Sequence, residues 1–262
     1  MKAVYFTEHG GPEVLKFGEL PEPTPGEGEV KIKVKACALN RLDVYTRAGV
    51  RGTKMDLAEP HVLGADVSGE VVEIGPKVTR VSAGDRVVVN PRITCMQCRY
   101  CQSNQTEYCG SAGMVGSAIR GGYAEYVVVP ATNAFPIPDA LNHVQAASLP
   151  TVFMPSWNIL IRRSQLKPWE TALVPSASSG VGSAAIQVAK NIAKSTVIAT
   201  TSTAEKAEKA AALGSDHVIN YKSEDVSERL KEITQGRGVD VVIDHVGTDV
   251  WNAANRRLAK GA

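Results

Sequence analysis

The pattern of apolar residues changes near residue 150 and divides the chain in two. Before this point, short segments alternate apolar and polar residues, as in Val30 to Ala36 (VKIKVKA), which is the pattern of a half-buried strand. Three further segments of this kind, separated by glycine and proline, are 69–74 (GEVVEI), 85–90 (DRVVVN) and 124–129 (AEYVVV). The first 150 residues are therefore predicted to form a barrel-like all-β domain.

Residues 151–262 instead alternate short apolar runs with segments of helical character. We expect strands at 171–175, 196–200, 217–220 and 240–244, and helices at 180–193, 204–213, 224–234 and 249–258. Gly214 can end the second of these helices as a cap. Buried strands joined by helices form a parallel sheet with helices on both faces. The sequence thus predicts an α/β protein with a doubly wound second domain, and 262 residues suffice for two domains.

A glycine-rich turn, PSASSGVG at 175–182, follows the first of these strands and opens the first helix. Such a turn directs backbone N–H groups and the positive end of a helix toward a dinucleotide pyrophosphate. Compared with G-x-G-x-x-G the motif is degenerate, and an ordinary tight turn is the alternative. The flanking strand and helix favour the cofactor interpretation. The expected contacts in this turn are Ala177, Ser179, Gly180, Val181 and Gly182.

Four of the five cysteines form the pattern C-x2-C-x2-C-x7-C: Cys95, Cys98, Cys101 and Cys109. Four thiolates at about 2.3 Å are the ligands of a closed tetrahedral zinc site. A four-iron cluster also uses C-x2-C-x2-C, but its fourth cysteine follows after three residues and precedes proline, whereas Gly110 follows here. We predict one structural zinc in a lobe at about 91–121, with an iron–sulfur cluster or a loop of free thiols as alternatives. A site with four thiolates has no open position for catalysis.

Several other features bear on the class of protein. Met1 is followed directly by KAVYFTEHGGPEV, without a basic and apolar leader, so we expect reduced thiols and a cytoplasmic protein. No run of about 18 apolar residues predicts a membrane span. The net charge of +2 gives no indication of nucleic-acid binding, and neither a membrane nor a nucleic acid is an expected partner.

The chain resembles the medium-chain dehydrogenase/reductase superfamily, in which a GroES-like catalytic domain precedes a Rossmann domain. The resemblance rests on the four-cysteine lobe, on SASSGVGSAAIQVAK, on GADVSGEVVEIG at 64–75 and on ALNRLDVYTRAG at 38–49. It implies a catalytic domain at 1–150 and a dinucleotide-binding domain at 151–262. It also implies a C-terminally truncated Rossmann domain, because four strands are visible where the family has six. We therefore expect an exposed sheet edge after the fourth strand, and a homo-oligomer only for a full-length form.

Alcohol dehydrogenases of this superfamily hold a second, catalytic zinc, and the sequence departs from their ligand pattern. Asn40 stands where their cysteine would be, Ala65 where their histidine would be, and Thr151 at the best match to the third ligand; Asp66 keeps the neighbouring acidic position. Zinc stabilises the oxygen of a simple carbonyl by several kcal/mol during reduction. Hydride addition to a quinone or enone instead spreads the charge, which a hydroxyl donor can stabilise and protonate.

The resemblance is therefore to the zinc-free quinone and enone reductases, whose pattern N-x-x-D-x-Y is matched by Asn40, Asp43 and Tyr45. It implies that Asn40 orients the nicotinamide ribose or the substrate, and that Tyr45 lies over the nicotinamide as a proton donor or positioner. Asp43 is expected to hold the loop. The alternative is that Tyr45 is a half-buried core aromatic and Asn40 a turn former. Cys37 is interpreted as a buried small apolar residue rather than as a metal ligand.

The choice of cofactor depends on the end of the second Rossmann strand, where an acidic residue would bind the ribose of NAD. Thr201 stands there, and hydroxyl groups together with a lysine suit the 2′-phosphate of NADPH. NAD is the alternative cofactor. The alternative for Lys206 is that it is one of several solvated lysines on its helix. Arg256 and Arg257 are interpreted as a solvated helix face. The further cofactor contacts expected are Thr151, Thr201, Ser202, Lys206, Tyr221, Val246 and Gly247, with His245 close by.

Three hypotheses on function follow. The leading one is an NADPH-dependent reductase of small quinones, enones or related carbonyl compounds that uses no catalytic zinc. The second is an alcohol dehydrogenase with an altered metal site. The third is a catalytically silent, nucleotide-binding module.

Overall fold

The computed structural model describes residues 1–244 and 247–262, and it divides the chain into two compact units, Met1–Thr151 and Val152–Ala262. His245 and Val246 lie outside the described residues. Within the described part, no helix is long and apolar enough to cross a membrane.

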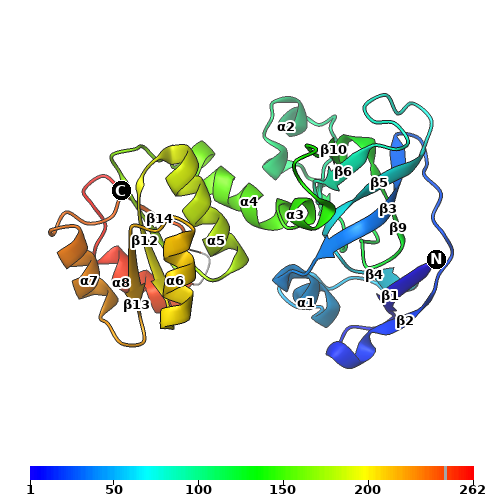
Figure 1. Ribbon diagram of the computed structural model, residues 1–262. Coiled ribbons are helices and arrows are strands. Elements are labelled where there is room, and N and C mark those ends of the chain that lie inside the picture. Colours follow the sequence, from blue (N-terminus) through cyan, green and yellow to red (C-terminus); the bar gives the residue numbers. More distant parts are fainter. Residues whose placement is uncertain (245–246) are drawn as a thin grey trace. The chain divides into compact units, whose positions relative to one another are not determined.

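The first unit is built on an antiparallel five-stranded sheet with the order β10-β6-β5-β3-β9 (Figure 1). Each of the four predicted strands is present in it. The alternation of β3 places Val30 and Ile32 in a core made mainly of valines, while Lys31 between them lies on the opposite face and pairs with glutamates. The strands of this sheet are β3 (Glu29–Ala38), β5 (Asp66–Ile74), β6 (Arg86–Val89), β9 (Tyr126–Pro130) and β10 (Ala134–Pro136).

A second, three-stranded sheet has the order β2-β1-β4. Its strands are β1 (Lys2–Phe6), β2 (Lys16–Glu19) and β4 (His61–Val62). The cysteine lobe contains the short pair β7 (Arg92–Ile93) and β8 (Gly113–Met114), together with α2 (Arg99–Gln102) and η2 (Thr106–Tyr108). The remaining helices of the unit are η1 (Pro12–Val14), α1 (Arg41–Ala48), η3 (Ala131–Asn133) and α3 (His143–Ala147).

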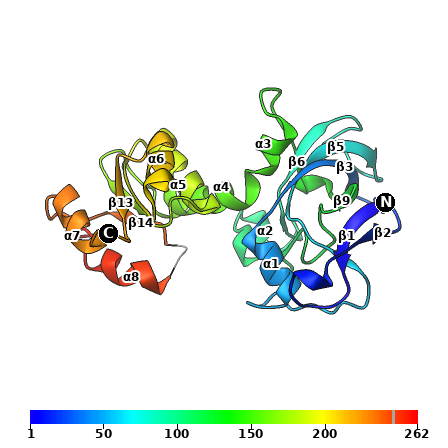
Figure 2. The ribbon, with the colours of Figure 1, turned by 60° about the horizontal axis from the view of Figure 1, so that its bottom comes forward.

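The second unit is a parallel sheet with the order β13-β12-β11-β14, which confirms the predicted doubly wound fold. Successive side chains of the fully buried strand β11 enter different cores: Val174 packs with Ile186 of α5, and Leu173 packs with Leu230 of α7. Helices therefore cover both faces, with α6 and α8 on opposite sides of the strands (Figure 2). The strands are β11 (Thr171–Val174), β12 (Thr196–Thr201), β13 (His217–Asn220) and β14 (Val241–Val242).

The helices of this unit differ from the prediction mainly at their ends. The helix expected at 180–193 is α-helical only to Gln187 and continues as a π-helix, η5 (Val188–Ala193). Gly214 has a φ of 113° and follows the second helix as expected. The helices are α5 (Gly180–Gln187), α6 (Ala204–Ala212), α7 (Val226–Ile233) and α8 (Thr248–Asn255); α4 (Pro150–Trp157) and η4 (Asn158–Arg163) precede them.

The last helix ends earlier than expected, and the chain after it pairs with the sheet. Val239, just before β14, donates its N–H to the carbonyl of Arg257 at 2.8 Å and accepts the N–H of Ala259 at 2.8 Å. Leu258 thus forms a parallel bridge with Val239. The edge that we expected to be exposed after the fourth strand is covered at this point.

Candidate functional site

The four cysteines of the lobe converge on one point. Their sulfur atoms all lie within 4.8 Å of one another. The Sγ of Cys95 is 3.6 Å from that of Cys109 and 3.9 Å from that of Cys101. A zinc tetrahedron with bonds of about 2.3 Å requires separations of about 3.8 Å, whereas a disulfide requires about 2.05 Å. The thiols are free, and their arrangement fits a bound zinc.

Backbone groups of the lobe also favour thiolates. The N–H of Cys98 donates to the sulfur of Cys95 at 3.4 Å, and the N–H of Cys95 donates to the sulfur of Cys109 at 3.5 Å. Backbone hydrogen bonds from Gln97 and Cys98 lower the pKa of Cys95 to about 6. Burial raises the pKa of Cys101 to about 11, so a metal would have to displace this proton when it binds.

A second set of polar residues meets where α1, β5 and α4 begin. Asn40 precedes α1, Asp66 is the first residue of β5 and Thr151 is the second residue of α4. The Nδ2 of Asn40 donates to Oδ2 of Asp66 at 2.9 Å, while Thr151 donates to Oδ1 from its N–H at 3.0 Å and from its hydroxyl at 2.7 Å. Asp66 is only 1% exposed. Burial raises the pKa of its carboxyl, and the hydrogen bonds from Thr151 and Asn40 oppose this shift.

These contacts fix the orientation of the Asn40 amide. An ionised carboxylate can only accept hydrogen bonds, so the group that Asn40 turns toward Asp66 must be its NH₂. The Oδ1 of Asn40 then faces away from Asp66 and can accept a hydrogen bond from a ligand. Asn40 and Thr151 are thus cross-linked through Asp66 by direct hydrogen bonds, and the neighbouring Ala65 offers no ligand atom.

No second metal cluster accompanies this arrangement in residues 1–244 and 247–262. The four cysteines are the only group of three or more histidine, cysteine, aspartate or glutamate residues there with ligand atoms close enough to share an ion. Cys37 is not a member of this group, and burial together with the nearby Asp43 and Asp66 raises the pKa of its thiol to about 12. Its thiol is therefore protonated at neutral pH.

Asp43 lies beside this network and binds three segments together. Its carboxylate accepts the N–H of Asn40 at 2.8 Å, the N–H of Gly64 at 3.1 Å and the hydroxyl of Tyr123 at 2.9 Å. The side chain is buried, and this burial raises the pKa of its carboxyl. Asp43 therefore holds the start of α1 against the loop that leads into β5.

Tyr45 lies within α1, and its ring contacts Arg51. Its ring is half-buried and lies 4.6 Å from the guanidinium carbon of Arg51. Within the described residues, no hydrogen bond joins the Tyr45 hydroxyl to Asn40 or Asp66. The hydrogen bonds therefore join Asn40, Asp66 and Thr151, with Asp43 beside them.

The glycine-rich turn between β11 and α5 is tightly closed. Ser179 caps α5, since its hydroxyl accepts the N–H of Gly182 at 3.0 Å. A Cβ on Gly182 would lie 2.3 Å from the carbonyl oxygen of Ser176, so the turn requires glycine there. The left-handed residue of the turn is Ser176, with a φ of 52°. The sequence motif did not identify Ser176, because a serine gives no sign of a positive φ.

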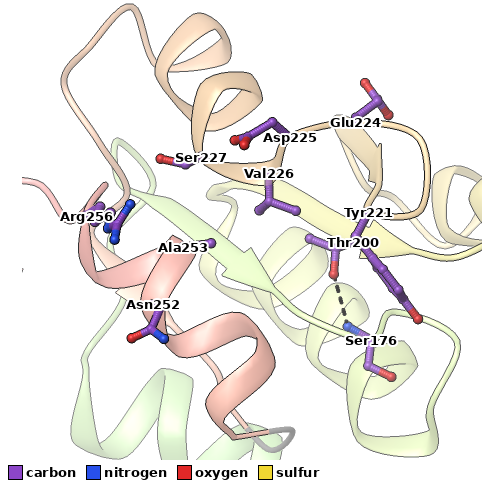
Figure 3. Close-up of a pocket in the computed structure, with 10 residues that line it drawn as sticks. All are labelled: Ser176, Thr200, Tyr221, Glu224, Asp225, Val226, Ser227, Asn252, Ala253 and Arg256. Atoms are coloured by element: carbon purple, nitrogen blue, oxygen red, sulfur yellow. Dashed lines mark hydrogen bonds between the residues drawn. The ribbon is translucent and has the colours of Figure 1, made fainter.

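A pocket of about 490 Å³ lies beside this turn, between α8 and the end of β12 (Figure 3). Tyr221 is one of the cofactor contacts expected from the sequence. The contributions of α7 and α8 were missed because nothing in the local sequence marks them. The ten lining residues are Ser176, Thr200, Tyr221, Glu224, Asp225, Val226, Ser227, Asn252, Ala253 and Arg256.

The expected cofactor residues Thr201, Ser202, Lys206 and Gly247 are not among the lining residues of this pocket. The hydroxyl of Thr201 is buried and donates to the carbonyl of Thr203 at 3.4 Å. The ammonium of Lys206 donates to the hydroxyl of Ser202 at 3.4 Å, and both side chains are partly exposed. Val246 lies outside the described residues, and the N–H of Gly247 donates to Asp244 at 2.9 Å.

The interpretation of Arg256 and Arg257 as a solvated face agrees with the exposure of Arg256 and was wrong for Arg257. Arg256 lines the pocket. Arg257 donates from Nε to the hydroxyl of Ser227 at 2.8 Å and from Nη2 to the carboxylate of Glu228 at 2.8 Å, which joins α8 to α7. An isolated helix pattern cannot reveal such contacts, because the partner is on another helix.

Comparisons with known proteins agree with this architecture. Residues 26–139 match the family model "Alcohol dehydrogenase GroES-like domain", and residues 180–262 match "Zinc-binding dehydrogenase". The NAD-dependent alcohol dehydrogenase of Sulfurisphaera tokodaii is 34% identical over 249 residues, which are 93% of this chain and 71% of that protein. The chain belongs to the medium-chain dehydrogenase/reductase superfamily. A crystal structure of an NAD-dependent alcohol dehydrogenase superposes on this superfamily member with a TM-score of 0.95 at 40% identity, covering 100% of the chain and 76% of that structure.

Quinone oxidoreductases are as similar to this dehydrogenase/reductase chain as alcohol dehydrogenases are. Quinone oxidoreductase 1 of Escherichia coli is 35% identical over 248 residues, which are 95% of the chain and 67% of that protein. Membership of the superfamily makes the protein an NAD(P)-dependent oxidoreductase that acts on small molecules, with a cysteine cluster that could bind a metal. The names of the relatives do not decide between the two substrate classes.

Proposed function

We propose that this chain carries the machinery of an NADPH-dependent reductase of quinones or enones that works without a catalytic zinc. The observation that supports this most is the pair of hydrogen-bonded contacts from Asn40 and Thr151 to Asp66. A metal needs lone pairs directed at it, whereas the Asn40 amide presents hydrogens toward Asp66. At the positions where alcohol dehydrogenases of the superfamily carry zinc ligands, Asn40 and Thr151 therefore hydrogen-bond to Asp66 instead of binding a metal ion.

The second unit supports binding of the cofactor. The capped N-terminus of α5 and the close approach at Gly182 suit a pyrophosphate, and the adjacent pocket has the size of a small-molecule site. Bound NADPH would supply the hydride. The hydroxyl of Thr201 replaces the acidic residue that would favour NAD, and Lys206 contributes a positive charge one turn into α6. We therefore infer a preference for NADPH, with NAD as the alternative.

The chemistry of the first unit follows from the orientation of Asn40. Its Oδ1 can accept a hydrogen bond from a ribose or substrate hydroxyl and so orient it. Tyr45 is the hydroxyl donor that we assign to the developing enolate or phenolate. Because this charge is spread over several atoms, a neutral donor suffices where a simple carbonyl would need a Lewis acid.

A turnover assay tests the proposal. The purified chain is mixed with NADPH and, in turn, with quinones, enones, aldehydes and ketones, while the cofactor absorbance is followed. We expect turnover with quinones or enones that persists after dialysis against a chelator too weak to strip the cysteine site. Turnover confined to aldehydes or alcohols and lost in that dialysis would favour the altered alcohol dehydrogenase. Binding of NADPH without any turnover would favour the silent module.

The preference for the phosphorylated cofactor has its own test. Lys206→Glu should weaken the binding of NADPH much more than that of NADH, because the new carboxylate repels a 2′-phosphate. Lys209→Glu, one helical turn farther along α6, serves as the matched control. An equal loss for both cofactors in Lys206→Glu would contradict the preference.

A further inference from the structure

Ser176 has a backbone conformation that a serine rarely adopts. Its φ of 52° lies in the left-handed region, where the Cβ of an L-residue crowds the backbone. Glycine is the usual residue at such a position because it has no Cβ. A strained residue of this kind in a functional region invites a search for what its side chain contributes.

The turn itself, and not the serine side chain, imposes this conformation. The N–H of Ser176 donates to the hydroxyl of Thr200 at 3.3 Å, and its carbonyl accepts the N–H of Ser179 at 2.9 Å. The same carbonyl approaches Gly182 so closely that no Cβ fits there. All of these contacts use backbone atoms of Ser176, so glycine at this position would preserve them without strain.

Ser176 is itself one of the residues that line the pocket. It is half-buried and lines the pocket wall with Thr200 and Tyr221 (Figure 3). The Thr200 hydroxyl is engaged by the Ser176 N–H, but the Ser176 hydroxyl has no hydrogen-bond partner among residues 1–244 and 247–262. A polar group at the pocket wall, directly after β11 and before α5, is therefore available to a ligand.

We propose that Ser176 is a binding residue of the cofactor site, whose hydroxyl hydrogen-bonds to a ribose or phosphate oxygen in the adenosine half of the cofactor. The inference rests on the proposed binding of NADPH and adds a contact to it. Ribose hydroxyls and phosphates both accept hydrogen bonds from a serine, so the two share one recognition chemistry. The serine at this position then lowers the stability of the fold, because of its positive φ, and raises the affinity for the cofactor, because of its hydroxyl.

Two substitutions separate strain from affinity. Ser176→Gly removes both the strain and the hydroxyl, so the variant should melt at a higher temperature than the wild type and bind ADP and 2′,5′-ADP roughly fivefold to tenfold more weakly. Ser176→Ala removes only the hydroxyl, so binding should weaken without the gain in melting temperature. Lys194→Gly is the matched control: Lys194 is exposed, has a φ of 60° and is outside the pocket, so melting should rise while binding stays unchanged.

Titration calorimetry with adenosine, ADP and 2′,5′-ADP identifies the acceptor. A loss of affinity that extends to adenosine assigns the contact to the ribose, and a loss seen only with ADP and 2′,5′-ADP assigns it to a phosphate. Unchanged binding of all three by Ser176→Gly, or no binding by the wild type, would overturn the inference. Because these titrations need no turnover, a wild type that binds ADP but reduces no quinone would refute the proposed reaction and leave the assignment of Ser176 standing.

Discussion

The side-chain amide of Asn40 lies 2.9 Å from the carboxylate of Asp66, a residue that is 1% exposed. Asn40 stands where alcohol dehydrogenases of the superfamily have a zinc ligand. Its contact with Asp66 gives the buried carboxylate a hydrogen-bond partner that is not a metal ion. Asp66 accepts three hydrogen bonds, one from Asn40 and two from Thr151. The acidic residue has become the centre of a closed polar network.

Asp66→Asn should destabilise the first unit by about 1–3 kcal/mol, because the new amide must turn a donor toward a group that also donates. Urea unfolding at pH 7 measures the change. The exposed Asp56→Asn makes the same chemical change away from the network and should have an effect within about 0.5 kcal/mol. Equal stability of the two variants would show that the network contributes nothing.

Tyr123→Phe should cost about 1.5–3 kcal/mol, because it removes a hydrogen bond to the buried carboxylate of Asp43. Burial and the nearby Asp43 raise the pKa of the Tyr123 hydroxyl, so it remains a donor at neutral pH. Tyr126→Phe, which keeps its ring near Lys31, is the control in the same unfolding experiment. A larger loss in the control would contradict the role given to Asp43.

The stability of the chain should fall as the pH decreases below about 6.5, in part because of His61. Burial lowers the pKa of its imidazole, which packs against Phe6 and donates to the carbonyl of Gly116 at 3.2 Å. The folded state keeps this ring neutral while the unfolded state takes up a proton, so acid favours unfolding. His61→Gln should show a smaller decrease in the free energy of unfolding between pH 7.5 and 5.5.

Other groups titrate in the same experiment but are common to both proteins. Burial lowers the pKa of His143 as well, and it raises the pKa values of Asp43 and Asp66, which act with the opposite sign. The comparison therefore uses the difference between wild type and variant. An identical pH dependence of the two proteins would mean that folding does not shift the pKa of His61.

Gly182→Ala should impair cofactor binding and lower stability by about 1–3 kcal/mol, because its Cβ would meet the Ser176 carbonyl at 2.3 Å. Gly110→Ala, where no heavy atom lies within 4 Å of the added Cβ, provides the control. Thermal melting and titration with ADP measure both effects. Normal ADP binding by Gly182→Ala would contradict the placement of the cofactor at this turn.

The sequence predicted those features that depend on neighbours along the chain. The spacing of the cysteines and the alternation of strand residues are local, and the structure has the corresponding elements. The contact between Asp66 and Thr151 joins residues far apart in sequence, so only the fold reveals it. The same is true of Arg256, whose place in the pocket depends on how α8 packs. The π-helical end of α5 was missed because apolar periodicity does not separate it from an α-helix.

The number of zinc ions per chain tests the central claim most directly. Inductively coupled plasma mass spectrometry on chain purified without chelators should find one zinc per chain, held by the four cysteines, and Cys109→Ser should lose it. Two zinc ions per chain, with one retained in Cys109→Ser, would show that Asn40, Asp66 and Thr151 leave room for a metal after all.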